Sequence, residues 1–207
     1  MYAPSPHKKR LLAVLGKITA TFETIEDEKT EAVTRSTRPA ITSDVFQFKI
    51  TLLDVKPPVW RRIQVPDCTL DVFHLYIQAA FGWWNSHLHQ FEIGGVMYGP
   101  PEPGDMGFDL ETEDETGVVL SELLPKSRTR VRWVYEYDFG DGWRHEVLFE
   151  GSPPFDAKLN YPLCVEGAMA CPPEDVGGPW GYGDYLDAIA DPKNERHNEL
   201  LEWSGPF

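Results

Sequence analysis

Residues 130–150 read RVRWVYEYDFGDGWRHEVLFE and predict a β-hairpin. Two runs in which apolar and polar residues alternate flank the dipeptide Asp141-Gly142. Asp-Gly suits a hairpin turn because it tolerates the positive φ angles that a tight turn requires. Alternate residues of a strand share one side of a sheet, so one face of this hairpin is apolar. That face consists of Val131, Trp133, Tyr135, Tyr137, Trp143, His145, Val147 and Phe149. We therefore expect this face to lie in a hydrophobic core, with His145 inside it.

The composition is that of a globular protein built from short elements. The chain has 207 residues, of which 42% are hydrophobic and 13% aromatic, enough to bury a sizeable core. It also contains 18 prolines and 17 glycines, which favour many short elements over long helices. We predict an α+β fold, with one domain in which a few helices pack on a mostly antiparallel sheet.

The chain divides into two regions of different composition. Residues 1–43 are predicted to be a flexible N-terminal extension and linker, because the part from Glu23 onward is charged, threonine-rich and nearly without large apolar side chains. Residues 44–207 are predicted to form the compact domain.

Within the compact domain, hydrophobic periodicity predicts the main elements. Strands are expected at residues 45–52, 59–65 and 87–93, and helices at residues 70–81, 182–190 and 194–203. Thr69 is a candidate N-cap of the first helix, and Gly82 is suited to end it. Two segments are expected to lack regular structure: an acidic, mobile loop at residues 100–117 and a turn-rich segment at residues 161–178.

The net charge argues against direct binding to nucleic acid. Nineteen basic residues face 33 acidic ones, giving a net charge of −14, and such a surface repels phosphate backbones. A protein partner or a small ligand is therefore favoured over DNA. The three cysteines lack the spacing of a disulfide framework, which indicates a reducing, cytoplasmic location. No stretch approaches the ~20 apolar residues of a membrane span.

One group of residues has the chemistry of a metal site. His87 and His89 occupy alternate positions of a predicted strand, so both imidazoles can point to one ion. His145, Cys164 and Cys171 would complete a set of nitrogen and sulfur ligands, which suits zinc. The alternative is that the cysteines are small buried residues and that His145 is a hydrogen-bonded core histidine.

A second group is acidic. Asp138 and Asp141 flank the predicted turn, and Glu174 and Asp175 follow two prolines. Carboxylates that converge with His145 could hold a hard cation or act as general acid and base, so Asp138, Asp141, His145 and Glu174 are the candidate catalytic residues. The alternative is that these carboxylates form turns and accept hydrogen bonds from nearby backbone amides.

A third group contains aromatic residues among glycines. Trp180 and Tyr182 lie between Gly177 and Gly183, where burial is less readily achieved. Together with Asp175 they are candidates for lining a pocket or a partner surface. Nucleophilic catalysis has no specific signal, because Ser86 beside His87 is not a triad and no Gly-x-Ser-x-Gly turn occurs.

Several motifs, taken in order, resemble one known family. They are Val59-Trp60-Arg61-Arg62, His87-Leu88-His89-Gln90-Phe91, Tyr137-Asp138-Phe139-Gly140-Asp141-Gly142-Trp143 with His145, and Ala170-Cys171-Pro172-Pro173-Glu174-Asp175 before Gly177-Gly178 and Gly181-Tyr182. Over residues 45–207 the chain resembles the plasmid pRiA4b ORF-3-like family. Some members of that family are labelled insertion-element passenger proteins, which implies a link to mobile DNA without implying a mechanism. The resemblance implies a compact α+β domain that commonly continues past Phe207, so this domain is expected to be short at its C-terminus.

Two functions remain open from the sequence. The first is a cytoplasmic, non-catalytic recognition or accessory protein. Its ligand surface would combine the His87/His89 strand, the hairpin tip and the segment from Cys164 to Tyr182. The second is a metal-dependent hydrolase that acts on nucleic acid or on a phosphorylated small molecule.

Overall fold

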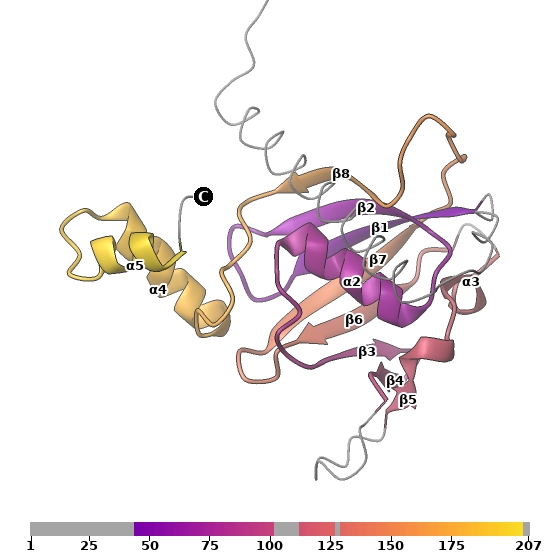
Figure 1. Cartoon of the computed structure of the whole chain (residues 1–207), viewed down its shortest axis with the longest axis horizontal. Helices are drawn as coiled ribbons and strands as arrows, with labels where there is room; N and C mark the ends of the chain where they lie inside the picture. Colours follow the sequence, from indigo (N-terminus) through magenta and orange to yellow (C-terminus); the bar gives the residue numbers. More distant parts are fainter. Residues whose placement is uncertain (1–43, 102–111, 127–128, 205–207) are drawn as a thin grey trace, which may run out of the picture.

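The computed structural model describes residues 44–101, 112–126 and 129–204. The predicted N-terminal extension, residues 1–43, lies outside the described residues, as does most of the acidic loop predicted at residues 100–117. The described part is an α+β fold, as the sequence predicts, in which an eight-stranded sheet carries helices (Figure 1).

The sheet is antiparallel except at one edge. Its strands are β1 (Val45–Leu52), β2 (Trp60–Pro66), β3 (His89–Ile93), β4 (Val96–Gly99), β5 (Glu113–Asp114), β6 (Arg132–Tyr137), β7 (Trp143–Gly151) and β8 (Leu163–Ala168). They lie in the order β5-β4-β3-β6-β7-β1-β2-β8, and the β4–β5 pair alone among them is parallel. The central strands β6, β7 and β1 are therefore hydrogen-bonded on both sides.

The predicted hairpin is confirmed. β6 and β7 pair antiparallel with Tyr137 opposite Trp143, which leaves residues 138–142 as the connecting loop. Gly142 N–H donates to the Asp138 carbonyl at 2.6 Å, and Gly142 adopts a φ of +67°. The aromatic face is buried as expected, with Tyr135 and Tyr137 fully inaccessible to solvent. The alternation of side chains in the sequence thus identified the centre of the core.

The helix predicted at residues 70–81 is also confirmed, and it crosses one face of the sheet (Figure 1). This helix, α2 (Leu70–Phe81), places Phe73 against Phe48 of β1 with ring centroids 4.7 Å apart. Gly82 ends it in the left-handed conformation, because glycine reaches a φ of +77° without a steric cost. Thr69 precedes the helix, but its hydroxyl bonds to the Asp71 side chain instead of capping a backbone N–H.

The remaining helices lie outside the central layer (Figure 1). They are the 3₁₀ turn η1 (Glu115–Gly117), α3 (Leu120–Leu123), α4 (Gly178–Ala190) and α5 (His197–Ser204). α4 and α5 pack on each other at one end of the molecule (Figure 1). The helices expected at residues 182–190 and 194–203 therefore exist, with the first beginning four residues earlier than predicted. In the described part of the chain, no helix has the length and apolar character of a bilayer-spanning segment.

Two segments expected to be irregular contain regular structure. The segment predicted to be turn-rich, residues 161–178, includes β8, which pairs with β2 and places Cys164 opposite Ile63. Its sequence lacks clear alternation because an edge strand buries few side chains, so the pattern was weak. Near the end of the predicted acidic loop, Glu115 is buried inside η1 instead of exposed.

The buried hairpin predicts a large stability loss on truncation of Trp143. Its side chain is 1% exposed, so Trp143→Ala should lower the free energy of unfolding by ~3 to 5 kcal/mol. Trp84→Ala is the matched control, because Trp84 is 83% exposed and its removal should change stability by less than about 0.5 kcal/mol. Equal urea midpoints for the two variants would contradict the burial of Trp143.

Candidate functional site

Three segments that are distant in sequence meet at one end of the sheet. They are residues 83–88 between α2 and β3, residues 138–142 between β6 and β7, and residues 171–182, which lead from β8 into α4. In Figure 1 these segments lie toward the left, where α4 begins. We call the surface that they form the tip surface.

Tyr137 and Trp83 connect the three segments. The Tyr137 hydroxyl accepts a hydrogen bond from Ser86 N–H at 2.9 Å and donates one to the Glu174 carboxylate. The Trp83 ring stacks on Tyr137 at a centroid distance of 5.1 Å, and its indole N–H donates to the Pro172 carbonyl at 3.0 Å. Burial, followed by the bond to Glu174, raises the pKa of Tyr137, so the hydroxyl remains a donor. These contacts hold the segments in fixed relative positions.

Asp138 and Asp141 shape the hairpin loop and join it to α4. Asp138 adopts a φ of +56°, and its Oδ1 accepts from the N–H of Gly140 at 3.0 Å. Asp141 Oδ2 accepts from Gly177 N–H at 3.1 Å. The backbones approach so closely there that a Cβ at Gly178 would collide with the Asp141 carbonyl oxygen. Both aspartates thus make the backbone contacts that the alternative interpretation of the sequence predicted.

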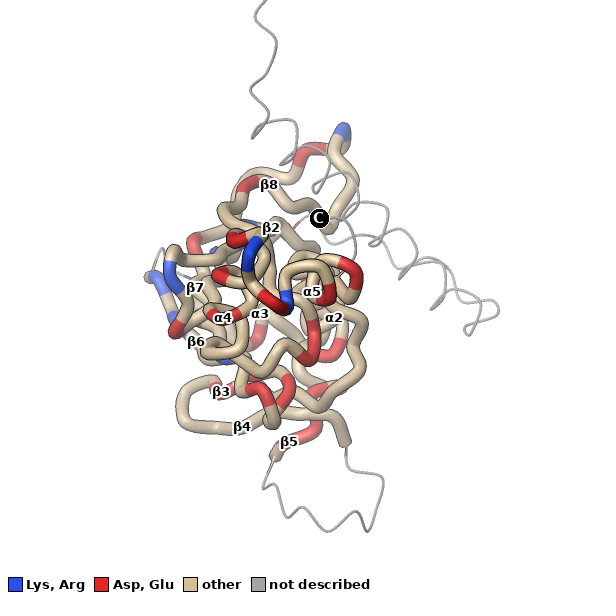
Figure 2. Tube along the Cα trace, turned by 90° about the vertical axis from the view of Figure 1, so that its left-hand side faces the viewer, with Lys and Arg blue, Asp and Glu red and all other residues tan. Residues whose placement is uncertain are grey.

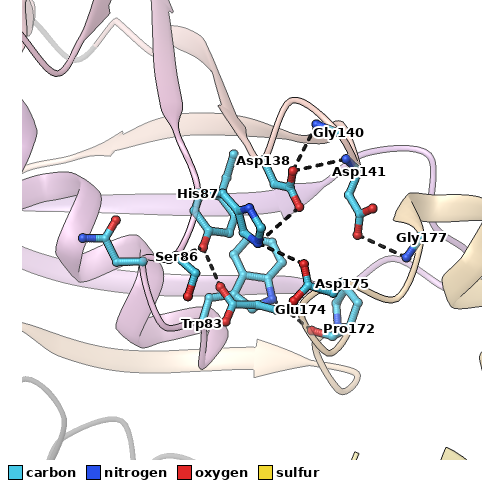
Figure 3. Close-up of polar contacts among 12 residues, drawn as sticks. Trp83, Ser86, His87, Asp138, Gly140, Asp141, Pro172, Glu174, Asp175 and Gly177 are labelled. Atoms are coloured by element: carbon cyan, nitrogen blue, oxygen red, sulfur yellow. Dashed lines mark hydrogen bonds and ion pairs between the residues drawn. The ribbon is translucent and has the colours of Figure 1, made fainter. Parts of the chain in front are cut away.

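His87 points its Nε2 toward two carboxylates of the tip surface (Figure 3). The distance is 3.0 Å to Asp175 Oδ1 and 3.6 Å to Asp138 Oδ2. The Nε2 atom is buried, and no described residue forms an aligned hydrogen bond with it. The short distances are electrostatic contacts, because a hydrogen bond also requires alignment.

Acidic residues dominate this end of the molecule. Residues 171–204 contain eight acidic and two basic side chains. Figure 2 looks at this end and shows red segments over α4, α5 and the end of the sheet behind them. A negative field of this kind attracts cations and repels phosphate groups.

His89 does not join His87. It begins β3, whereas His87 lies two residues before the strand, and the two side chains have different surroundings. His89 is buried against His74 of α2, with the rings parallel and 3.4 Å apart, and its Nε2 lies 2.9 Å from Glu115. The expectation that both imidazoles face one ion assumed a regular strand through residue 87, and the chain bends there instead.

His145, Cys164 and Cys171 also lie apart from His87. His145 is fully buried between aromatic rings, and its Nδ1–H donates to the Tyr135 carbonyl at 3.3 Å. Burial raises the pKa of both thiols to about 11, so they are protonated at neutral pH. The Cys171 sulfur accepts a hydrogen bond from buried Arg61 at 2.9 Å. These surroundings are those of packing residues, the alternative that the sequence left open.

The structure assembles a different set of potential metal ligands. In the described residues, one group of three or more histidine, cysteine or acidic side chains has its ligand atoms within 4.8 Å of one another. That group is His87, Asp138 and Asp175. Each of the three was singled out in the sequence, but His87 was placed in the nitrogen and sulfur group and both aspartates in the acidic group, which was paired with His145 instead. The five-residue nitrogen and sulfur set is not brought together.

The remaining candidates divide between surface and core. Trp180 is 89% exposed in the first turn of α4, whereas Tyr182 is 3% exposed and donates to the Ala170 carbonyl. Tyr182 therefore packs the segment and does not line an open pocket. Glu174 is engaged by Tyr137, and Asp175 is exposed at its carboxylate.

Comparison with known proteins identifies the family. Residues 44–207 match the family described as plasmid pRiA4b ORF-3-like protein. The chain belongs to this family.

Two relatives of this pRiA4b ORF-3-like protein are themselves of unknown function. The uncharacterised protein y4hQ of Sinorhizobium fredii (strain NBRC 101917 / NGR234) is 41% identical over 168 residues, covering 80% of this chain and 83% of y4hQ. The crystal structure of MM3350 from Methanosarcina mazei Go1, a protein of unknown function, is 32% identical with a TM-score of 0.68. That comparison covers 79% of this chain and 92% of MM3350. The relatives support the fold and supply no activity.

Residues that hold the site in place were missed in the sequence. Arg61 donates to the Ala80 carbonyl of α2 and to the Ala168 carbonyl of β8, both at 3.1 Å, which ties together the two elements that lead into the tip surface. The alternation of Arg61 with Ile63 and Val65 would have placed it on the buried face. Glu115 had no comparable signal, because the residues around it form no periodic pattern.

The buried histidines of this pRiA4b ORF-3-like protein predict a loss of stability in mild acid. Burial lowers the pKa of His145 to about 3, compared with about 6.5 in an unfolded chain. The unfolded state therefore binds more protons below pH 6.5, and folding becomes less favourable as the pH falls. Between pH 7 and pH 5, His145 alone should reduce the free energy of unfolding by about 2 kcal/mol.

Urea denaturation of His145→Phe across this pH range measures the effect. The variant should show a correspondingly weaker dependence on pH, whatever its absolute stability. If the free energy of unfolding of His145→Phe depended on pH as strongly as that of wild type, groups other than His145 would cause the loss of stability in acid.

Proposed function

We propose that this protein is a non-catalytic recognition or accessory protein that binds a protein partner or a small ligand through the tip surface. We further propose that it acts in the cytoplasm and in association with mobile genetic elements, as the passenger label of some family members implies. His89 is not part of the proposed surface, because it is buried against His74.

The observation that carries the proposal is the exposure of two large aromatic side chains on segments that the fold holds rigid. Trp84 is 83% exposed and Trp180 is 89% exposed. Both follow anchored positions, since Trp83 is bonded to Pro172 and Gly177 is bonded to Asp141. Exposed tryptophans on fixed backbone are typical anchors of binding surfaces, because their burial releases water from a large area at low entropic cost.

The negative charge of the tip surface disfavours nucleic acid as the partner. Asp138, Asp141, Glu174 and Asp175 lie on two of its three segments, and no Lys or Arg occurs in residues 83–88, 138–142 or 171–182. A nucleic-acid backbone would meet repulsion there. This supports a protein partner or a small ligand over direct binding to DNA.

A metal-dependent hydrolase is the second candidate. The observation that favours it is the group of His87, Asp138 and Asp175, whose donor atoms lie within 4.8 Å of one another. The catalytic set considered from the sequence included His145, Glu174 and Asp141. His145 is buried away from solvent, and Glu174 is hydrogen-bonded to Tyr137. Asp138 is therefore the candidate that the hydrolase function retains from that set, now grouped with His87 and Asp175.

Trp180→Ala should reduce recovery of the partner at least about tenfold in quantitative affinity purification, because an anchoring tryptophan commonly contributes more than about 2 kcal/mol. The urea midpoint should not change, since the side chain is 89% exposed. Leu159→Ala is the control, because Leu159 is 43% exposed in the β7–β8 connection, outside the tip surface. Equal recovery by Trp180→Ala and wild type would count against the proposal.

A phosphodiester assay separates the two candidate functions. With Mn²⁺ or Zn²⁺ present, the recognition function predicts no more cleavage of bis(p-nitrophenyl) phosphate by wild type than by Asp138→Asn. Metal-dependent turnover that disappears in Asp138→Asn would favour the hydrolase instead.

A further inference from the structure

We propose that His87, Asp138 and Asp175 bind one divalent transition-metal ion, such as Zn²⁺ or Mn²⁺, whose remaining positions accept a donor atom from the bound ligand. The second half of this inference rests on the proposed function. The first half, metal binding, stands without it.

The separations of the three side chains match those of ligands around one ion. Two atoms held ~2.1 Å from a metal lie ~3.0 Å apart at an octahedral angle and ~3.4 Å apart at a tetrahedral one. His87 Nε2 lies 3.0 Å from Asp175 Oδ1 and 3.6 Å from Asp138 Oδ2. The three atoms therefore have nearly the spacing of a coordination sphere before any ion is bound.

The imidazole nitrogen of His87 forms no hydrogen bond with the described residues. This atom, Nε2, is buried, although two carboxylate oxygens are close to it. A buried polar atom without a hydrogen bond is costly, so such an atom at a cluster of oxygens is a sign of a missing ligand. A cation between these groups would satisfy the nitrogen lone pair and both negative charges.

The two aspartates are held in position by the backbone. Asp138 and Asp175 adopt φ values of +56° and +59°, a conformation that side chains other than Gly, Asn and Asp rarely take. Asp138 uses Oδ1 for the N–H groups of Gly140 and Asp141, which leaves Oδ2 directed toward His87. One carboxylate oxygen thus fixes the loop while the other remains available to an ion.

The chemical types of the three side chains determine which metal ions the site would prefer. One imidazole with two carboxylates, and no thiolate, suits Zn²⁺, Mn²⁺ or Fe²⁺ better than Ca²⁺ or Mg²⁺, which prefer oxygen ligands alone. Three protein ligands leave at least one position open, whereas a closed structural zinc site has four. The Asp175 side chain is 70% exposed, so the open positions face solvent or a bound ligand.

Direct electrostatic contact between His87 and the two carboxylates, with no metal, is the competing explanation. A direct measurement separates the two explanations, because only the metal site predicts stoichiometric binding of an added ion.

The test uses the full chain, treated with a chelator and dialysed, and titrates Zn²⁺, Mn²⁺ and Mg²⁺ separately by calorimetry. We expect one site, with Zn²⁺ bound more tightly than Mn²⁺ and Mg²⁺ not bound measurably. Asp138→Asn and Asp175→Asn should each weaken Zn²⁺ binding at least about tenfold. Asparagine tolerates the same positive φ and still accepts the loop hydrogen bonds, so both variants should fold.

Asp184→Asn is the matched control. It removes one exposed carboxylate from α4, outside the group, and should bind Zn²⁺ like wild type. No stoichiometric binding by wild type, or equal weakening by all three variants, would overturn the metal site.

Partner recovery in the presence of a chelator is measured separately. If metal binding fails but Trp180→Ala still loses the partner, the proposed function survives without the metal. If metal binds and recovery is unchanged by chelation, the ion does not contact the ligand.

Discussion

The hydroxyl of Tyr137 is the point on which the arrangement of the tip surface depends. Tyr137 ends β6 with its ring buried, and its hydroxyl lies between Ser86 N–H and the Glu174 carboxylate. One oxygen thus joins the segment before β3 to the segment before α4, and both to the central hairpin. Because the ring also stacks on Trp83, the three segments cannot shift independently. The positions of His87, Asp138 and Asp175 follow from this junction.

The core beneath the tip surface contains a network of buried polar side chains. His74 stacks on His89, its Nδ1 lies 2.8 Å from the Tyr135 hydroxyl, and the Gln78 amide donates to the same hydroxyl at 2.9 Å. Burial lowers the pKa of His74 to about 3, so it packs as a neutral ring. A buried polar network of this kind permits few alternative packings, since each misplaced side chain would leave another unsatisfied. It connects α2 to β3 and β6 and so supports the end of the sheet that carries the site.

Much of the fold could be predicted because its strongest elements have strong local patterns. The β6–β7 hairpin alternates strictly about Asp141-Gly142, and α2 carries apolar residues at helical spacing up to Gly82. β8 was missed because only Cys164 of its six residues is fully buried, which leaves no alternation to detect. The candidate site was predicted in pieces. His87, Asp138 and Asp175 were each noted, but the sequence suggested partners that lay nearby or shared a residue type, such as His89 for His87.

The sequence by itself determined the α+β class, the central hairpin, the main helix and the acidic character of the C-terminal region. These properties depend on the order of apolar and polar residues and on charge, which are local or additive. Only the tertiary structure decided which side chains meet. His87 and Asp138 are separated by 51 residues and Asp175 by a further 37, and side-chain direction at each depends on a bend or a left-handed residue. A bend at residue 87 separates the side chains of His87 and His89, which a regular strand would place on one face, and no periodicity in the sequence records such a bend.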